Sequence, residues 1–480
     1  MTIIQNYIDQ RFCEPQSGSY LDNINPRTGQ VYSRLPDSNA QDVDLAVQAA
    51  KRAFPDWSRS SRQERSDLLN ALADAIAARL DDFAWAESED QGKPVKLAKN
   101  VDIPRAIANF RFFAGAILHQ EESAYQSSPD VLNLTQRAPL GVAGLISPWN
   151  LPLYLLTWKL APALATGNTV VAKPSELTPM TAYLLAQLID EIGFPPGVCN
   201  IVYGKGATAG DALVGHPDVP LISFTGGTQT ATMISKRAAP FQKKLSFELG
   251  GKNPALIFSD CDFQACLDTS IRSSFTNQGE ICLCTSRLFV HENIVDRFCD
   301  EFLAATRQLK VGDPRQDETF MGPLVSADHW QKVDGMVQRA VAAGAHLLCG
   351  GRGMDMPDEL TKGYYYQPTI LRTQDTSLEI MQEEVFGPVV TITSFRDYDE
   401  ALAMANGVKY GLAATVWTKD LSTAQRAALD LEAGLVWVNT WMNRDLRVPF
   451  GGSKASGVGR EGGRYSLEFY TEEKNICFQI

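Results

Sequence analysis

The sequence predicts an α/β fold built on parallel sheets. Short segments rich in β-branched residues alternate with stretches of helix length whose apolar residues recur at three- and four-residue spacing. Regular alternation of strands and helices is typical of a parallel sheet with helices on both faces. A second alternating block begins near Asn253. The 480 residues, 44% of them hydrophobic, are sufficient for two such domains.

The first part of the chain is predicted to be helical. Between residues 61 and 90, leucine, isoleucine and phenylalanine recur at three- and four-residue steps, which predicts one long helix with an apolar face. Gly92 and Pro94 follow at once, and both residue types end helices. A second helix is predicted over 103–118.

Five strands are predicted in the block that begins near Leu140. They comprise residues 142–146, 169–173, 200–203, 221–225 and 244–248. The motifs SPWN, AKPSE and FTGGT lie at the ends of three of these strands. Because ligands of parallel sheets bind at the carboxyl ends of the strands, these loops are candidates for a binding site.

The second block runs from about Asn253 to Asn439 and has the same alternating pattern. Its predicted helices comprise residues 262–275, 293–309, 326–343 and 398–405. Two extended segments fit neither block: a polar one at 120–137 and a terminal strand at 468–480. Segments of this kind suggest that subunits pair by strand addition.

Composition argues against nucleic-acid and membrane proteins. The net charge is −12 and the pI is near 5.1, so we expect no nucleic-acid partner. The most apolar stretch, 151–165, contains Lys159 and two prolines and is shorter than the ~20 apolar residues that a bilayer requires. We therefore expect no membrane segment, and the amino-terminal residues lack the pattern of a signal peptide.

The cysteines and histidines indicate a reduced protein without a metal site. The nine cysteines include no CxxC pair, which favours free thiols and a cytoplasmic location over a disulfide scaffold. The five histidines include no HExxH motif, so we expect no zinc site.

One region combines residues suited to covalent catalysis. Glu248 ends a predicted strand just before a Gly-Gly pair, and Cys282 lies in the polar segment NQGEIC. A cysteine thiolate and a carboxylate base together make a covalent catalyst. Taken singly, the commoner alternatives are an inert buried thiol and a surface carboxylate. Asn150 also has two interpretations, because its amide can donate to an oxyanion or cap the helix that begins near Pro152.

Two glycine motifs have different interpretations. Gly226 and Gly227 follow a predicted strand and precede a helix, which could bring the helix N-terminus near a phosphate. Residues 457–462 match GxGxxG but follow no predicted strand, and we interpret them as a turn. The chain contains neither GxxxxGK[ST] nor GxSxG, so P-loop NTPases and α/β-hydrolases are not indicated.

The motifs taken together resemble those of the NAD(P)-dependent aldehyde dehydrogenase superfamily. The series is SPWN, AKPSE, FTGGT, ELGGKNP, NQGEIC, EEVFGP and PFGGSKASGVGRE, and the resemblance extends from about residue 7 to residue 480. Within the superfamily, DIPRAIANFRFFA, ISPWNLPLYLLTWK, NQGEICLCTSR and WVNTWMNRDLRVPFGG resemble segments of the muconic semialdehyde dehydrogenases.

The resemblance implies a site and a domain organisation. It implies that Cys282 is the nucleophile, that Asn150 and the Cys282 N–H form the oxyanion hole, and that Glu248 is the general base. It implies NAD as cofactor, bound by Pro148, Trp149, Lys173, Ser175, Glu176, Gly206, Phe224, Thr225, Gly226, Gly227, Leu249, Glu384 and Phe386. The implied domains are a Rossmann-like cofactor domain (1–119 and 138–247), a catalytic α/β domain (248–455) and a small β oligomerisation arm (120–137 and 456–480). A homodimer or homotetramer is expected.

Two residues depart from the family pattern FTGSTxxG. Gly227 replaces a serine, and Ala231 replaces the later glycine. Contacts to a phosphate should therefore depend more on backbone N–H groups.

The implied substrate is a small aldehyde that bears a carboxylate. Arginine suits bidentate carboxylate binding, and the resemblance places Arg105 and Arg444 along the substrate tunnel. Both arginines could instead form ordinary ion pairs. Arg111 is interpreted as structural, and the role of Arg447 stays open. The alternatives are another aldehyde, such as betaine aldehyde, which two arginines would repel, and a non-catalytic structural homologue, against which the presence of Cys282, Glu248 and Asn150 argues.

Overall fold

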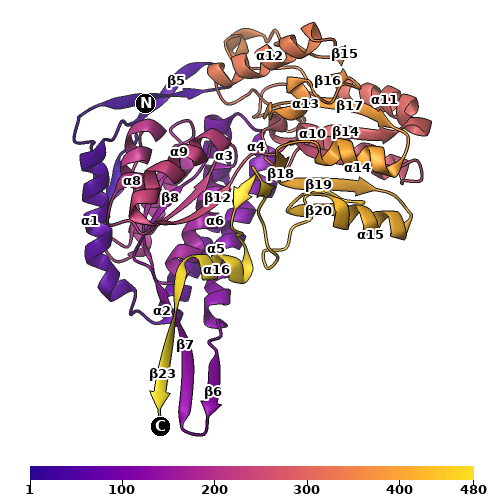
Figure 1. Cartoon of the computed structure of the whole chain (residues 1–480). Helices are drawn as coiled ribbons and strands as arrows, with labels where there is room; N and C mark the ends of the chain where they lie inside the picture. Colours follow the sequence, from indigo (N-terminus) through magenta and orange to yellow (C-terminus); the bar gives the residue numbers. More distant parts are fainter.

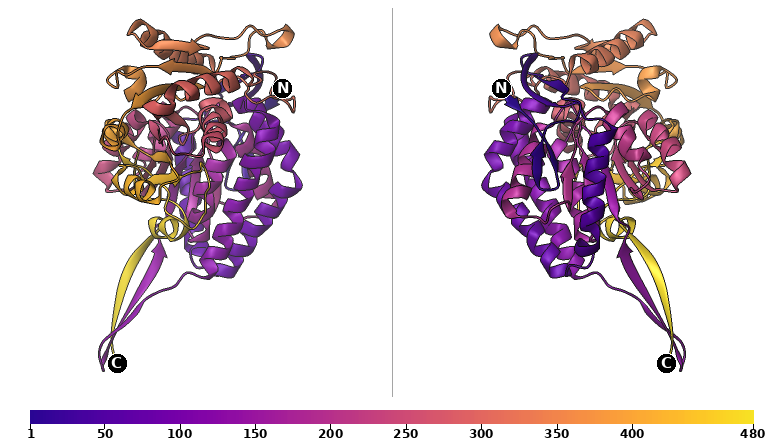
Figure 2. Two further views of the ribbon diagram at one scale, coloured as in Figure 1. Left: turned by 90° about the vertical axis from the view of Figure 1, so that its right-hand side faces the viewer. Right: turned by 90° about the vertical axis from the view of Figure 1, so that its left-hand side faces the viewer.

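Two sheets, each flanked by helices, form the body of the molecule, and a thin arm projects from it (Figures 1 and 2). The computed structural model describes all residues, 1–480. The α/β fold class is confirmed. No helix combines the length and the apolar character needed to cross a bilayer.

The first sheet has eight strands in the order β22-β12-β11-β8-β9-β10-β2-β3. Its five central strands are parallel: β8 (Val142–Ile146), β9 (Thr169–Lys173), β10 (Cys199–Ile201), β11 (Leu221–Thr225) and β12 (Lys244–Glu248). Four of them match the predicted bounds. The predicted strand 200–203 is wrong at both ends, because it begins at Cys199 and because the Tyr203 N–H donates to the Asn6 side chain beyond it.

Three short antiparallel strands complete the two edges of this sheet. β2 (Asn6–Ile8) and β3 (Arg11–Cys13) lie at one edge, and β22 (Gly457–Val458) pairs with β12 at the other. The interpretation of 457–462 as a turn is therefore wrong for its first two residues. Gly459 and Gly462 do turn the chain, with φ of 86° and 94°.

The helices of the first half pack against the sheet in two apolar cores. They include α1 (Ala40–Trp57), α2 (Arg62–Ala78), α3 (Leu80–Gln91), α5 (Ile103–Leu118), α6 (Pro152–Ala165), α7 (Met180–Ile192), α8 (Asp211–Gly215) and α9 (Thr228–Ala238). The first core contains residues of α2, α3, α5, α6 and α7, and the second contains residues of α1, α8 and α9. The single helix predicted over 61–90 is wrong, because Arg79 has non-helical backbone angles and separates α2 from α3. Gly92 ends α3 with φ 92°, and α5 has the predicted bounds.

The second sheet has the order β15-β16-β17-β14-β13-β19-β20. Its strands are β13 (Asn253–Ile257), β14 (Thr285–His291), β15 (His346–Cys349), β16 (Thr369–Arg372), β17 (Val389–Phe395), β19 (Ala413–Trp417) and β20 (Leu435–Val438), and only β15 is antiparallel. Its helices are α10 (Phe263–Phe275), α11 (Glu292–Arg307), α12 (Ala327–Ala342), α13 (Glu379–Gln382), α14 (Tyr398–Asn406) and α15 (Leu421–Asp430). The four predicted helices lie within two residues of α10, α11, α12 and α14.

The arm is a three-stranded antiparallel sheet in the order β23-β7-β6 (Figure 2). β23 (Thr471–Gln479) pairs along its whole length with β7 (Val131–Pro139), which also pairs with β6 (Ala124–Ser128). The terminal strand is predicted to begin at 468, but it begins three residues later, at Thr471, because residues 468 and 469 are the last two of α16 (Gly463–Phe469). Leu467 and Tyr470 are buried in the first core, which holds this segment against the body.

The remaining short elements connect these units. β1 (Thr2–Ile3), β4 (Tyr20–Asn25) and β5 (Gln30–Pro36) form a separate sheet, and β18 (Tyr410–Gly411) pairs with β21 (Ser453–Lys454). The one-turn helix α4 (Val95–Leu97) leads into α5.

Candidate active site

A cavity of about 490 Å³ lies beyond the carboxyl ends of β8, β9 and β11. Ten of the predicted cofactor residues line it: Pro148, Trp149, Lys173, Ser175, Glu176, Gly206, Phe224, Thr225, Gly226 and Gly227. The position agrees with the general rule for parallel sheets.

The cavity has the chemistry of a dinucleotide site. The hydroxyls of Ser147 and Thr225 are buried there without a hydrogen-bond partner. Helix α9 begins at Thr228, and the preceding Gly227 has no side chain to cap it, so the first N–H groups of the helix are available to an anion. A side chain at Gly227 would meet no atom within 4 Å, which means that the space in front of the helix is open.

The ribose end of this cavity carries a fixed carboxylate. Glu176 accepts hydrogen bonds from Lys173 Nζ at 3.0 Å and from the Gly206 N–H at 3.3 Å. Burial opposes ionisation of Glu176, but the Lys173 charge and these hydrogen bonds outweigh it and lower its pKa. Glu176 is therefore a hydrogen-bond acceptor at neutral pH.

A second cavity of about 230 Å³ brings together Cys282, Glu248 and Asn150. It shares Pro148, Trp149, Thr225, Gly226 and Gly227 with the cofactor cavity. The remaining predicted cofactor residues, Leu249, Glu384 and Phe386, also line it. Three segments far apart in the sequence therefore meet where the two sheets face each other.

Hydrogen bonds of its backbone carbonyl and of its side-chain amide hold Asn150 in place. Its carbonyl accepts from Lys93 Nζ at 3.0 Å and from Asn277 Nδ2 at 3.2 Å, and its own Nδ2 donates to the Glu280 carbonyl at 2.9 Å. Helix α6 has no side-chain cap at its start, so the alternative that Asn150 caps this helix is wrong. One N–H of the Asn150 amide stays available in the cavity.

Glu248 is buried at the end of β12, and neither carboxylate oxygen has a hydrogen-bond partner. Burial and the neighbouring Glu461 carboxylate raise its pKa well above the usual range, against the opposing charges of Lys159 and Arg444. The surface-carboxylate alternative is therefore wrong. A buried carboxylate of high proton affinity beside a thiol is suited to proton transfer.

Cys282 is surrounded by carboxylates. Burial, Glu384 and Glu248 raise the pKa of its thiol to about 12, and Arg444 acts in the opposite direction. The Cys282 carbonyl accepts from Asn253 Nδ2 at 2.7 Å, which fixes the loop. Cys284 lines neither the 490 nor the 230 Å³ cavity, and its thiol contacts the Thr276 carbonyl at 3.9 Å.

Glu384 and Phe386 lie on one loop after α13. Glu384 accepts from the Gly251 N–H at 2.9 Å. Phe386 has φ 61°, which is costly for a residue with a side chain, and its carbonyl accepts from His329 Nε2 at 2.6 Å. Its ring meets the edge of Trp149 with centroids 5.2 Å apart. These contacts hold the loop over the cavity.

Arg444 and Arg105 converge on Tyr154. Arg444 lines a small third cavity with Cys282 and Glu248, donates to the Tyr154 hydroxyl at 2.6 Å and stacks on Phe450 at 3.9 Å. The Arg105 guanidinium lies 5.5 Å from the centroid of the Tyr154 ring, although Arg105 does not line that cavity. Neither arginine forms a salt bridge, so the ion-pair alternative is wrong for both.

The other two arginines, Arg111 and Arg447, form ion pairs at the surface. Arg447 is exposed and pairs with Asp445, and Arg111 pairs with Asp74 on the surface of α5. Arg111 therefore has a surface structural role, and Arg447 contacts none of the cavities.

Sequence reasoning missed several residues around this site. Fully buried Lys159 donates to Glu461 and to Ser223, both at 2.9 Å. A lysine within an apolar helix indicates that a buried partner is needed, but the sequence does not show which one, because Glu461 is 302 residues away. His329 and Tyr154 also line the cavities, and nothing in their local sequence indicates it.

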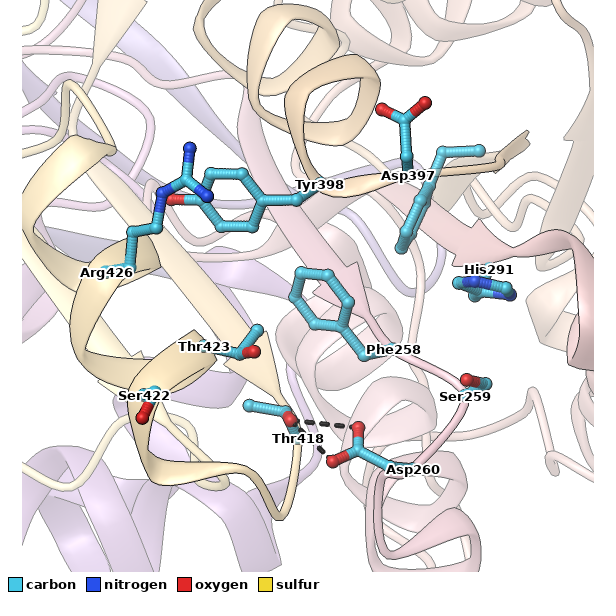
Figure 3. A pocket seen from close by; sticks show the side chains of 11 residues that line it. Phe258, Ser259, Asp260, His291, Asp397, Tyr398, Thr418, Ser422, Thr423 and Arg426 are labelled. Carbon is cyan, nitrogen blue, oxygen red and sulfur yellow. Dashed lines mark hydrogen bonds between the residues drawn. The ribbon is translucent and has the colours of Figure 1, made fainter.

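A further cavity of about 430 Å³ lies at the carboxyl ends of the second sheet (Figure 3). Its two aspartates and its histidine are already used within the chain. Asp260 accepts from the Thr418 hydroxyl, and Asp397 and His291 cap α14 and α11. No cysteine lines this cavity, so the chemistry belongs to the first group of cavities.

Comparison with known proteins gives matches over nearly the whole chain. The profile described as "Aldehyde dehydrogenase family" matches residues 12–476. The chain is 54% identical over 478 residues to the 2-aminomuconic semialdehyde dehydrogenase of Danio rerio, with 99% of this chain and 98% of that protein covered. It is 51% identical to the protein of the same name from Homo sapiens, with the same coverage. It is 46% identical to the 2-hydroxymuconic semialdehyde dehydrogenase of Pseudomonas sp. (strain CF600), with both chains covered completely.

Solved structures have the same fold. A putative aldehyde dehydrogenase from Burkholderia cenocepacia superposes with a TM-score of 0.98 at 42% identity, covering 99% of this chain and 97% of that one. A betaine aldehyde dehydrogenase from Staphylococcus aureus in complex with NAD+ superposes with a TM-score of 0.96 at 37% identity, covering 99% and 94%.

Proposed function

Because the chain belongs to the aldehyde dehydrogenase family, we propose that it oxidises 2-aminomuconate 6-semialdehyde or 2-hydroxymuconate semialdehyde to the acid. The chain is an NAD-dependent oxidoreductase that acts on aldehydes. The observation that carries the proposal is the meeting of Cys282, Glu248 and Asn150 in one cavity, with two arginines free of salt bridges on its substrate side.

The names of the relatives favour these substrates over others. Proteins that are 46–54% identical over nearly the whole chain are named for aminomuconic or hydroxymuconic semialdehyde. The betaine aldehyde dehydrogenase is less similar, at 37%. Both muconic substrates carry a carboxylate, which Arg105 and Arg444 can bind, whereas cationic betaine aldehyde would be repelled.

In the proposed reaction, the Cys282 thiolate attacks the aldehyde carbon and forms a thiohemiacetal. The Asn150 amide and the Cys282 N–H donate to the oxygen that gains negative charge. NAD, held in the adjoining cavity, would supply the hydride acceptor for oxidation of the thiohemiacetal to a thioester on Cys282. Glu248 then takes a proton from water, which attacks the thioester and releases the acid and the thiol. The buried position of Glu248 keeps its proton affinity high enough for this role.

The residues of the 490 Å³ cavity, together with Glu384 and Phe386 of the 230 Å³ cavity, would hold NAD. The N–H groups of α9 suit the pyrophosphate, Lys173 and Glu176 suit the adenosine ribose, and Glu384 and Phe386 suit the nicotinamide end. Since Gly227 has no hydroxyl, backbone N–H groups are the donors at this helix start.

NAD should be preferred over NADP by a large factor. Ionised Glu176 accepts hydrogen bonds from ribose hydroxyls but repels a 2′-phosphate, and a like-charge contact of this kind costs several kcal/mol. Measured kcat/KM should therefore be at least roughly 100-fold higher with NAD. In Glu176→Gln the ratio should fall, and Lys173 would then assist the phosphate. Equal kcat/KM for both cofactors in the unmodified enzyme contradicts this role of Glu176.

We also propose the domain division suggested by the family. Residues 1–119 and 138–247 form the cofactor domain, and 248–455 form the catalytic domain. Residues 120–137 and 456–480 supply the oligomerisation arm. Its projecting part is the sheet of β6, β7 and β23, whereas β22 and α16 lie against the body. The strands at the edges of this arm present unpaired backbone groups, which suits pairing of subunits in a homodimer or homotetramer.

Changing Arg105 or Arg444 to alanine should weaken binding of the muconic semialdehyde. A hydrogen bond to a charged group contributes ~1.5–3 kcal/mol, so kcat/KM should fall roughly 10- to 150-fold, mostly through KM. A neutral aldehyde of similar length should lose little. Arg444→Ala should also shift the pH profile for both aldehydes to higher pH, because Arg444 opposes the raised pKa values of Glu248 and Cys282. For each aldehyde, kcat/KM is therefore measured at a pH at which it no longer changes with pH.

The control variant is Arg111→Ala, which removes a surface ion pair and should leave both activities unchanged. Equal losses on the charged and the neutral aldehyde would contradict carboxylate recognition by these arginines. The substrate would then have to be sought among neutral aldehydes.

A further inference from the structure

Tyr154 is the point where the two arginines of the substrate side meet. It lies on α6, is 3% exposed and lines the small cavity that contains Cys282, Glu248 and Arg444. Its hydroxyl oxygen accepts from Arg444 Nη1 at 2.6 Å, and the Arg105 guanidinium faces its ring at 5.5 Å. Asn109 Nδ2 donates to its carbonyl at 3.1 Å, which fixes this turn of the helix.

The hydroxyl hydrogen of Tyr154 has no acceptor in the chain. A phenol both accepts and donates, and the bond from Arg444 uses only the accepting side. A buried donor without an acceptor is costly, so such groups normally have a partner. Phe450 lies against Arg444, and Leu151 and Leu155 line the same cavity. Glu248 and Glu461 also line it, but neither carboxylate accepts a hydrogen bond from the Tyr154 hydroxyl.

The two positive charges beside Tyr154, Arg105 and Arg444, also form no salt bridge within the chain. Arg105 has no hydrogen bond within the chain either. Asp445 is close enough for Arg105 to contribute to its low pKa, but Arg447 already holds both of its oxygens. Glu461 is bound by Lys159. Glu248 lines the same small cavity as Arg444, but it forms no hydrogen bond with either arginine. The two arginines can therefore still donate to the carboxylate of a bound substrate.

We propose that Tyr154 is a specificity-determining residue that donates a hydrogen bond from its hydroxyl to the substrate carboxylate. Its oxygen and its ring at the same time hold Arg444 and Arg105 beside that carboxylate. The inference rests on the proposed function, because it assigns a third donor to the same carboxylate. It goes further in that it makes a neutral side chain of the buried helix α6 part of substrate recognition.

The test is Tyr154→Phe, which keeps the ring under Arg105 and removes only the hydroxyl. For the muconic semialdehyde, kcat/KM should fall roughly tenfold or more, mainly through KM, because a charged acceptor loses one donor. A neutral aldehyde of similar length should change less than about twofold. Inhibition by adipate, a six-carbon dicarboxylate without an aldehyde, should weaken by a similar factor. The control is Tyr398→Phe. It removes a hydroxyl on α14 that donates to Asp430 on α15, both helices of the second sheet, and it should alter none of these values.

A double variant separates contact with substrate from mere support of Arg444. If Tyr154 donates to the carboxylate directly, Tyr154→Phe should still cost several-fold in the Arg444→Ala background. No further loss in that background would mean that Tyr154 acts only through Arg444, and the inference would be overturned. Equal losses on charged and neutral aldehydes would overturn it as well.

The outcomes also distinguish this inference from the proposed function. Selective losses in Arg105→Ala and Arg444→Ala without one in Tyr154→Phe would reject the role of Tyr154 and leave the function standing. If none of the three variants discriminates between the aldehydes, the carboxylated substrate itself is wrong. Thermal unfolding of each variant shows whether a general loss comes from damage to the fold.

Discussion

Replacing Cys282 with alanine should abolish aldehyde oxidation. Removal of a covalent nucleophile typically lowers kcat by roughly four to six orders of magnitude, because the covalent intermediate can then no longer form. Binding of NAD should persist, since Cys282 lines the 230 Å³ cavity and not the 490 Å³ cofactor cavity. The measurements are NADH formation over time and calorimetric titration with NAD.

The neighbouring cysteine provides a matched control. Cys284 is also buried but lines neither of these cavities, and its thiol faces the Thr276 carbonyl. Cys284→Ala should therefore keep most of the activity. Substantial turnover by Cys282→Ala, or a greater loss in Cys284→Ala, would show that the nucleophile has been misassigned.

Replacing Glu248 with glutamine should block the second half of the reaction. General base catalysis contributes roughly 10²–10⁴-fold, so the hydrolysis of the thioester should slow by about that factor. The first NADH equivalent should still form, and a substrate adduct on Cys282 should accumulate and be visible by mass spectrometry. A normal steady-state rate without an adduct would rule Glu248 out as the base.

The pH profile gives an independent test of the same residue. Burial and the Glu461 carboxylate raise the pKa of Glu248, so its proton is lost only above the usual range of a glutamate. A base must be deprotonated, and the deacylation rate should therefore rise with pH through this raised pKa. In Glu248→Gln this limb should disappear. Glu461→Gln removes the nearby charge and should move the limb to lower pH.

Much of the fold could be predicted because local preference and tertiary structure agree. Three parallel strands, 142–146, 169–173 and 221–225, are fully buried, and such strands appear in the sequence as short, mostly apolar runs. The break at Arg79 could not be predicted, because no glycine or proline marks it. The edge strand β22 was missed because two residues carry no periodicity.

The candidate site, too, could be predicted from the sequence only in part. Cys282, Glu248 and Asn150 lie in distinctive motifs, so their roles could be proposed from the sequence alone. The bond between Arg444 and Tyr154 could not, because it joins residues 290 positions apart and depends on how the two sheets face each other. The raised pKa of Glu248 likewise depends on Glu461, which sequence spacing does not connect to it.

The ion pair of Lys159 and Glu461 should form late in folding. The two residues are 302 positions apart, and contacts across so long a stretch of chain close after local structure has formed. A partly folded molecule can contain the β12 strand and its glutamate without the carboxylate that tunes it. Turnover would then be confined to molecules that have completed their tertiary structure, and recovery of activity after dilution from denaturant should lag behind recovery of helical circular dichroism.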